Sequence, residues 1–195
     1  MRIMLLFVDT ETTGLPKHSA TNDIEKWPRV VQLAWSLYDN DGHCENLNSS
    51  IIYPTDFIIP QEAASIHGIT TERAKKEGVS LHKVLPQFNA DVENAVTIIA
   101  HNAEFDLPIV NTEFIRCKLE TNLLNKQKFC TMKTPQIISY CKLPKPSGMG
   151  YKWPALNELH LQLFETEFTG SHNASADVEA CAKCYFELRK RGVIK

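Results

Sequence analysis

The run IMLLFV at residues 3–8 leads directly into DTETTG at residues 9–14. A short apolar run bounded by polar residues predicts a buried β-strand. Strand side chains alternate between two faces, so Asp9 and Glu11 fall on the same face as Phe7. Two carboxylates that continue an apolar face repel each other and resist ionisation unless a cation intervenes. The alternative is that the strand ends before both acids and leaves them solvated, and this stretch alone does not decide between the two.

The rest of the chain shows strand patterns first and then strands that alternate with helices, which is typical of an α/β protein with a mixed sheet. The predicted strands cover residues 30–38, about 46–53 and 96–100, and the predicted helices cover residues 61–67, 71–77, 80–93, 103–118, 131–141, 154–163 and about 174–191. The turn signal at residues 40–42 predicts an antiparallel meander. Pro108 is expected to kink or restart its helix. Residues 143–154 are expected to form a mobile but ordered loop within a single domain, 1–195.

Composition matches an ordinary globular protein, with 43% hydrophobic and 23% charged residues. No apolar run reaches the roughly 18–20 residues that span a bilayer, and residues 3–8 lack the cleavage site of a signal peptide. Among six cysteines, only Cys181 and Cys184 form a C-x-x-C pair. Both lie on one face of a predicted helix, which favours packing over metal or redox chemistry. Free thiols and no membrane segment predict a cytoplasmic protein.

Two further acids fall on faces that should be buried. Asp106 is in helical phase with Ile109 and Val110, and Asp177 heads a stripe that continues through Cys181. A carboxylate at either helix end could also simply interact with the helix dipole, and for each acid alone that is the simpler interpretation. Three segments that each place an acid on the core side favour a shared site instead.

A site built from four carboxylates suits two divalent cations, Mg²⁺ or Mn²⁺. Such a pair supports in-line attack of water on a phosphodiester, because one cation activates the water and the other stabilises the leaving oxygen. Two bound cations would bring the formal net charge from −2 to +2, which would attract a phosphate backbone. His172 lies five residues before Asp177, and its ordinary pKa suits a general base at the rim of this site.

Three motifs contain these residues in order: DTETTG at 9–14, HNAEFD at 101–106 and HNASAD at 172–177. Together they resemble the DEDD exonucleases of the ribonuclease-H-like fold, in the subgroup that uses histidine. The third motif has the His-x4-Asp spacing of that subgroup. RVVQLAW at 29–35 and IHGIT at 66–70 also resemble family segments. The resemblance implies a mixed central sheet, with three antiparallel strands plus parallel strands, flanked by helices.

The resemblance also implies roles. Asp9, Glu11 and Asp177 would bind the cation next to the attacking water. Asp9 and, mainly through water, Asp106 would bind the second cation, and His172 would deprotonate the water. The residues implied to contact the substrate are Thr12, Thr13, Leu15, His67, Asn102 and Phe105. For Leu15 and Phe105 the alternative is plain core packing, and for His67 it is a loop-capping role.

The predicted activity is 3′→5′ hydrolysis of single-stranded or frayed DNA ends that releases 5′-mononucleotides, as in the proofreading or repair exonucleases that the chain most resembles. Trimming of RNA 3′ ends is an alternative, and a binding module without catalysis is a weaker one. A polymerase or clamp partner is conceivable. Residues 160–164 (HLQLF) resemble a clamp-binding peptide but lack its leading glutamine and fall in a predicted core helix.

Overall fold

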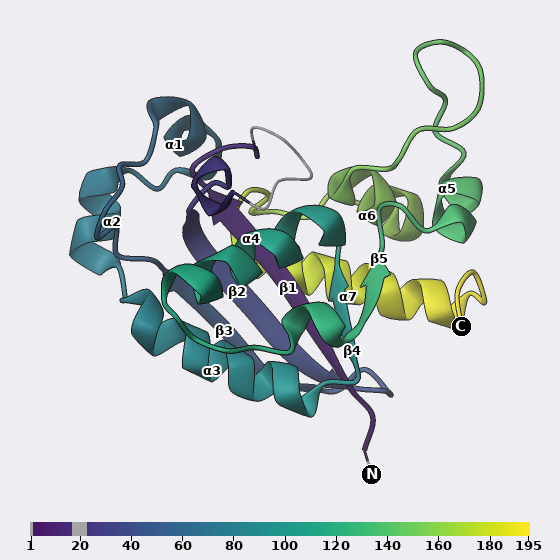
Figure 1. The fold of residues 1–195 in the computed structure, drawn as a ribbon. Coiled ribbons are helices and arrows are strands. Elements are labelled where there is room, and N and C mark those ends of the chain that lie inside the picture. The colour runs from purple at the N-terminus through teal and green to yellow at the C-terminus, as the bar shows by residue number, and fades with distance from the viewer. Residues whose placement is uncertain (1, 17–22) are drawn as a thin grey trace.

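The computed structural model describes residues 2–16 and 23–195, which build one five-stranded sheet with the order β3-β2-β1-β4-β5 (Figure 1). The first three strands are antiparallel, and β4 and β5 run parallel to β1. The strand bounds are β1 Met4–Thr12, β2 Val30–Asp39, β3 Cys44–Ile51, β4 Thr97–Ala100 and β5 Gln127–Cys130. The expected mixed sheet is therefore confirmed.

Helices cover both faces of the sheet (Figure 1). The α-helices are α1 Gln61–His67, α2 Thr71–Glu77, α3 Leu81–Asn94, α4 Ala103–Arg116, α5 Pro135–Cys141, α6 Leu156–Phe164 and α7 Ala174–Lys190, and two 3-10 turns lie at η1 Ile24–Lys26 and η2 Leu123–Asn125. One core cluster joins α3 and α4 to one face, and a second joins α6 and α7 to the other. In the part of the chain that the structure describes, no helix is long and apolar enough to cross a membrane.

Strand β1 contributes to both clusters because its side chains alternate. Leu6 and Val8 lie on the α4 side, and Leu5 and Phe7 lie on the α7 side. The strand continues to Thr12, so both acids of the first motif belong to it. The alternative of a strand that ends before the acids is therefore wrong.

Three details differ from the sequence prediction. Strand β5 was not expected, since its four residues at the sheet edge show no clear alternation. Helix α5 begins at Pro135 rather than at residue 131, because a turn occupies residues 131–133 and proline favours the first helical position. Helix α4 runs through Pro108 without a break. The missing hydrogen bond would have reached Glu104 in the exposed first turn, where water can replace it.

The cysteines and the proline-rich loop also have clear positions. All six cysteines are free, and Cys181 and Cys184 are buried in the cluster under α7, so packing is confirmed. Residues 143–152 form a narrow hairpin, in which Lys152 N–H donates to the Leu143 carbonyl at 2.8 Å. This hairpin protrudes near α5 (Figure 1).

Candidate metal centre and active site

Three carboxylates meet at the carboxyl end of β1. Asp9 and Glu11 lie on the α7 side of the strand, and Asp177 lies in the first turn of α7. One ligand oxygen from each of the three lies within 4.8 Å of the others. Asp177 is buried, and Asp9 and Glu11 are half-buried. Carboxylate oxygens so arranged fit a hard divalent cation such as Mg²⁺ or Mn²⁺.

The electrostatics of this carboxylate triad (Asp9, Glu11 and Asp177) also fit a cation. Burial, and then the charges of Asp106, Asp177 and Glu11, raise the pKa of Asp9 well above its usual value. Burial, followed by the neighbouring aspartates, raises the pKa of Glu11 to about 7. Burial raises the pKa of Asp177 to about 6 although the His172 N–H opposes the shift. The triad therefore needs protons or a cation to offset its negative charge.

Asp106 approaches from the other side of β1. Its Oδ1 accepts hydrogen bonds from the Thr10 backbone N–H at 3.1 Å and from the Thr10 hydroxyl at 2.7 Å. The side chain is buried, and burial raises its pKa to about 7. Its charge acts on both Asp9 and Glu11, but it is not one of the three mutually close ligands. The structure thus brings all four predicted acids together, with Asp106 the most separate.

His172 stands at the rim of the triad. Its backbone has φ 66°, a left-handed conformation that is unfavourable for a residue with a Cβ. This turn directs the His172 N–H to Asp177 Oδ2 at 3.0 Å. The side chain is exposed and forms no hydrogen bond with any described residue. An imidazole held beside a carboxylate and open to solvent can accept a proton from water.

The predicted substrate contacts surround the same strand end. The Thr12 hydroxyl donates to the Gly14 carbonyl at 2.7 Å, and the Thr13 hydroxyl accepts from the Arg29 N–H at 2.9 Å. Leu15 is 81% exposed, which excludes the core alternative for this residue.

His67 lies between the Ile69 N–H and the Thr12 backbone. Its Nδ1 accepts the Ile69 N–H at 3.1 Å, which is the loop-capping contact, and burial lowers the pKa of this histidine. In the neutral ring the proton is then on Nε2, and this buried atom has no hydrogen-bond partner among the described residues. The loop-capping role is therefore present, while the Thr12 backbone carbonyl partly opposes the lowering of the pKa of this ring.

The sequence profile of the exonuclease family matches residues 6–185, which include all of these residues. The chain belongs to the exonuclease family. This result confirms the DEDD exonuclease resemblance that the three motifs carry.

This exonuclease-family chain is similar to one polymerase subunit in sequence and to several solved exonucleases in fold. It is 27% identical over 177 residues to the DNA polymerase III subunit epsilon of Treponema pallidum, covering 91% of this chain and 72% of that protein. Its fold is similar to that of E. coli Exonuclease I in complex with a dA16 oligonucleotide, with TM-score 0.78, 19% identity and 97% of this chain covered. The Exonuclease I of Methylocaldum szegediense is similar at TM-score 0.77 and 18% identity. The chain spans 41% of the length of each of these two solved chains.

Sequence reasoning missed two contributors in this exonuclease-family chain. Thr10 positions Asp106 from the opposite face of β1, and only the fold reveals that contact. Glu113 is fully buried and pairs with Arg29 and Arg116. It follows Asp106 by seven residues on the same helix face, so the rule that singled out Asp106 could also have found it.

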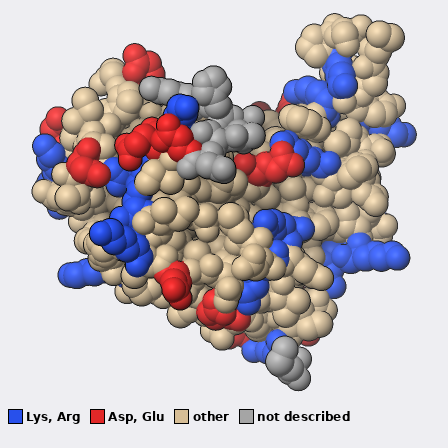
Figure 2. Space-filling view, viewed as in Figure 1, with Lys and Arg blue, Asp and Glu red and all other residues tan. Residues whose placement is uncertain are grey.

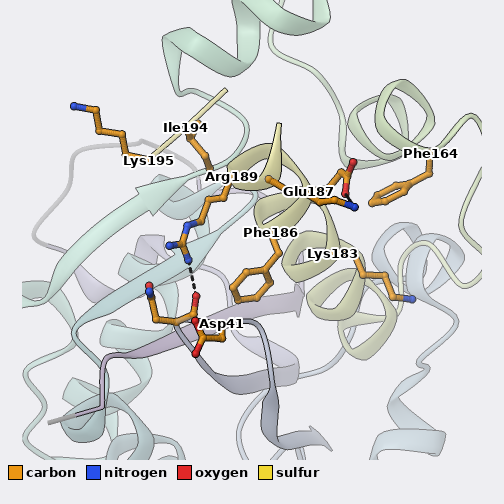
Figure 3. Close-up of a pocket in the computed structure, with 10 residues that line it drawn as sticks. Asp41, Phe164, Lys183, Phe186, Glu187, Arg189, Ile194 and Lys195 are labelled. Atoms are coloured by element: carbon orange, nitrogen blue, oxygen red, sulfur yellow. Dashed lines mark hydrogen bonds and ion pairs between the residues drawn. The ribbon is translucent and has the colours of Figure 1, made fainter. Parts of the chain in front are cut away.

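A hollow of about 650 Å³ lies at the C-terminal end of α7, away from the carboxylate triad (Figure 3). Phe186, Glu187 and Lys183 line it, and Arg189 Nη1 donates to the Asn40 carbonyl at 2.9 Å there. None of the predicted site residues contributes to it. Residues 160–164 lie in α6 with His160 and Leu163 buried, which supports the core-helix interpretation of that segment over clamp binding.

Proposed function

We propose that this protein is a 3′→5′ exonuclease that removes 5′-mononucleotides from the end of single-stranded or frayed DNA with two divalent cations, Mg²⁺ or Mn²⁺. The observation that carries the proposal is the carboxylate triad, whose oxygens converge within 4.8 Å at the end of β1 and whose pKa values are all raised. A cluster of this kind gains most from divalent charge.

The proposed role of each residue follows from its position in the site. Asp9, Glu11 and Asp177 would hold one cation, and Asp9 with Asp106 would hold the second. When bound, the cations supply the positive charge that activates water and stabilises the leaving 3′ oxygen. His172, exposed beside Asp177, would accept the proton of the attacking water. Thr10 keeps Asp106 in place through two hydrogen bonds.

The terminal nucleotide would lie against the turn that follows β1. Thr12 and Thr13 lie at the start of this turn, exposed Leu15 would insert beside the last base, and His67 would line the pocket of the terminal nucleoside. Asn102 begins α4 without capping it through its side chain, so its amide is available to the nucleic acid. Phe105 is half-buried and lies near Leu15 in the same groove.

DNA is favoured over RNA because E. coli Exonuclease I has been seen with a dA16 oligonucleotide and because the epsilon relative is a DNA polymerase subunit. The same relative makes a polymerase the first partner to test, and a cytoplasmic location follows from such a role. On the face drawn in Figure 2, positive and negative side chains are mixed rather than gathered into one basic patch. Affinity for nucleic acid would then depend on the metal-loaded site, which argues against a passive binding module.

The test compares 5′-labelled single-stranded DNA and RNA of one sequence, each with Mg²⁺ or Mn²⁺. We expect stepwise shortening of DNA from the 3′ end and release of 5′-mononucleotides. Asp9→Asn should lower the rate at least about 10³-fold. Glu120→Gln, an exposed acid on another surface, serves as the matched control.

Four outcomes would contradict the proposal in different ways. Equal activity of Asp9→Asn would mean that the triad is not catalytic. Shortening from the 5′ end would overturn the polarity, and faster trimming of RNA would favour the RNA alternative. Absence of any cleavage with either metal would remove the proposed activity altogether.

A further inference from the structure

The loop at residues 165–171 joins α6 to His172, the residue proposed as the general base. Its sequence, ETEFTGS, contains one large apolar residue, Phe168, and the other six residues are polar or glycine. A short polar loop gains little from burial and loses conformational entropy when it is ordered. Contacts from outside the loop are therefore needed if His172 is to keep one position.

The imidazole of His172 has no anchor of its own. It is exposed and forms no hydrogen bond with any described residue, whereas the backbone N–H of His172 donates to Asp177 Oδ2 at 3.0 Å. The chain on the other side of His172 continues into loop 165–171, where the Gly170 carbonyl accepts from the Asn173 N–H at 3.1 Å. The direction in which the imidazole points thus depends on where this loop lies.

Helix α6 contacts the loop through His160, whose side chain is buried. The Nδ1 atom of His160 lies 2.8 Å from the Thr166 carbonyl oxygen, and because a carbonyl oxygen only accepts hydrogen bonds, Nδ1 carries the proton. The ring centre of His160 lies 5.4 Å from that of Phe168 and 4.6 Å from that of Phe164. One buried ring therefore holds the loop at two points, at its backbone and at its apolar side chain.

Helix α7 does not support the same part of the loop. A second hollow, of about 350 Å³, is lined by three residues of the loop and three of α7, namely Glu167, Phe168, Thr169, Ala176, Glu179 and Ala180. The loop comes close to α7 only further along, at Gly170, where an added Cβ would lie 3.1 Å from the Ala176 Cβ. A hollow cannot restrain the segment beside it, so the support of residues 166–168 comes from α6.

We propose that His160 is a positioning residue that acts through His172. It fixes loop 165–171 against α6, and the loop then places the imidazole of His172 at the rim of the carboxylate triad. The inference rests on the proposed exonuclease function. It also gives a role to the HLQLF segment at residues 160–164, whose first and last side chains contact each other beside the loop.

A double-mutant cycle separates positioning from plain core packing. His160→Leu removes the donor and the ring but keeps an apolar side chain of similar size in α6. We expect it to lower kcat on saturating single-stranded DNA by roughly tenfold, because a displaced base no longer meets the attacking water. In a His172→Ala background the same change should lower the rate no further, since the residue through which it acts is gone.

Phe168→Ala tests the other partner of the contact, and a half-buried loop residue can be removed without unfolding the core. It should lower kcat several-fold and add little to His160→Leu. Leu159→Val, a change on the buried face of the same helix, is the matched control, which should lower the melting temperature and leave kcat unchanged. Mn²⁺ affinity, measured by calorimetry, should stay near that of the wild type in all three variants, because none of them removes a carboxylate.

Proteolysis of the metal-free protein tests the loop without any catalysis. The loop contains Glu165 and Glu167, both exposed, and a glutamyl endopeptidase cleaves after such residues when the backbone can leave its fixed conformation. His160→Leu should speed cleavage at these two sites by about fivefold or more, whereas cleavage after exposed Glu120 should not change. Mass spectrometry identifies each cut.

Three results would overturn the inference. Equal losses of kcat in the wild-type and His172→Ala backgrounds would show that His160 acts on the whole fold. Unchanged kcat in both His160→Leu and Phe168→Ala would show that the loop does not place the base. Unchanged cleavage of the loop would show that His160 does not hold it. A wild-type protein that degrades no DNA would instead overturn the proposed function, and the proteolysis would still decide whether His160 fixes the loop.

Discussion

Glu113 on α4 and Asp9 on β1 are both acids inside the protein, but their surroundings are opposite. Glu113 is fully buried, and one of its oxygens accepts from Arg29, Arg116 and a backbone N–H. Asp9 lies beside three other carboxylates, and burial with their charges raises its pKa. A buried acid that has its cations built in serves the structure, whereas a cluster of acids without them requires a ligand.

The largest expected effect separates activity from stability in the acid cluster. Asp9→Asn should abolish exonuclease activity, by at least about 10³-fold, because a metal ligand is lost. The same change should raise the melting temperature of the metal-free protein at pH 8, because one of several repelling charges is removed. Scanning fluorimetry in the presence of a chelator measures this melting temperature. A lower melting temperature would mean that Asp9 is a structural acid like Glu113.

The next effect concerns the base. His172→Ala should lower the rate by about 10²–10⁴-fold while Mn²⁺ affinity, measured by calorimetry, changes little. His82→Ala, an exposed histidine on α3, is the matched control. Loss of Mn²⁺ binding in His172→Ala would show that the histidine supports the metal centre rather than proton transfer.

For the paired acid the expected change is in stability. Glu113→Gln should lower the free energy of unfolding by about 3 kcal/mol, because Arg29 and Arg116 lose their buried partner. Mn²⁺ affinity should remain near that of the wild type, because Glu113 is not a ligand. Urea unfolding with calorimetry distinguishes the two properties. A neutral effect on unfolding would contradict the structural role of this network.

The smallest expected effect is a dependence of stability on pH. Because the folded protein raises the pKa of Glu11 and of Asp106 to about 7, it retains protons that the unfolded chain has already lost. The metal-free protein should therefore lose stability as pH rises from about 4 to 7, with a fall of about 5 °C in melting temperature.

Added Mn²⁺ should reverse that loss at pH 8, since it binds only the folded state. Asp9→Asn should show a flatter profile than Glu120→Gln, which retains the whole cluster. A metal-free wild-type protein that becomes more stable between pH 4 and 7 would contradict the repulsion among the four acids.

The sequence predicted the parts of the fold that depend on local pattern. Alternation in β1 placed Asp9 and Glu11 on one face, and helical phase placed Asp106 and Asp177 towards the core. The same patterns could not reveal contacts between distant segments, such as Thr10 with Asp106 or Arg29 with Glu113. These depend on how β1, β2 and α4 meet, which is a property of the assembled sheet.

The local sequence pattern also failed to predict the short strand β5. Strand β5 has four residues, and its place at the sheet edge follows from pairing with β4 rather than from its own composition. Only the family resemblance supplied the roles of Leu15, His67 and Phe105, and those roles stay predictions.

The side chains of β1 alternate between two faces, and this alternation divides the residues of the site between α7 and α4. Odd-numbered Asp9 and Glu11 face α7, and even-numbered Thr10 faces Asp106 on α4. A substitution along this strand changes one side chain, but an insertion or deletion of one residue within β1 before Asp9 would exchange the two faces for the residues that follow. The acids would then enter the α4 core, and the hydroxyl that supports Asp106 would point at Asp177. The register of β1 between Met4 and Asp9 is therefore as strict a requirement as the acids themselves.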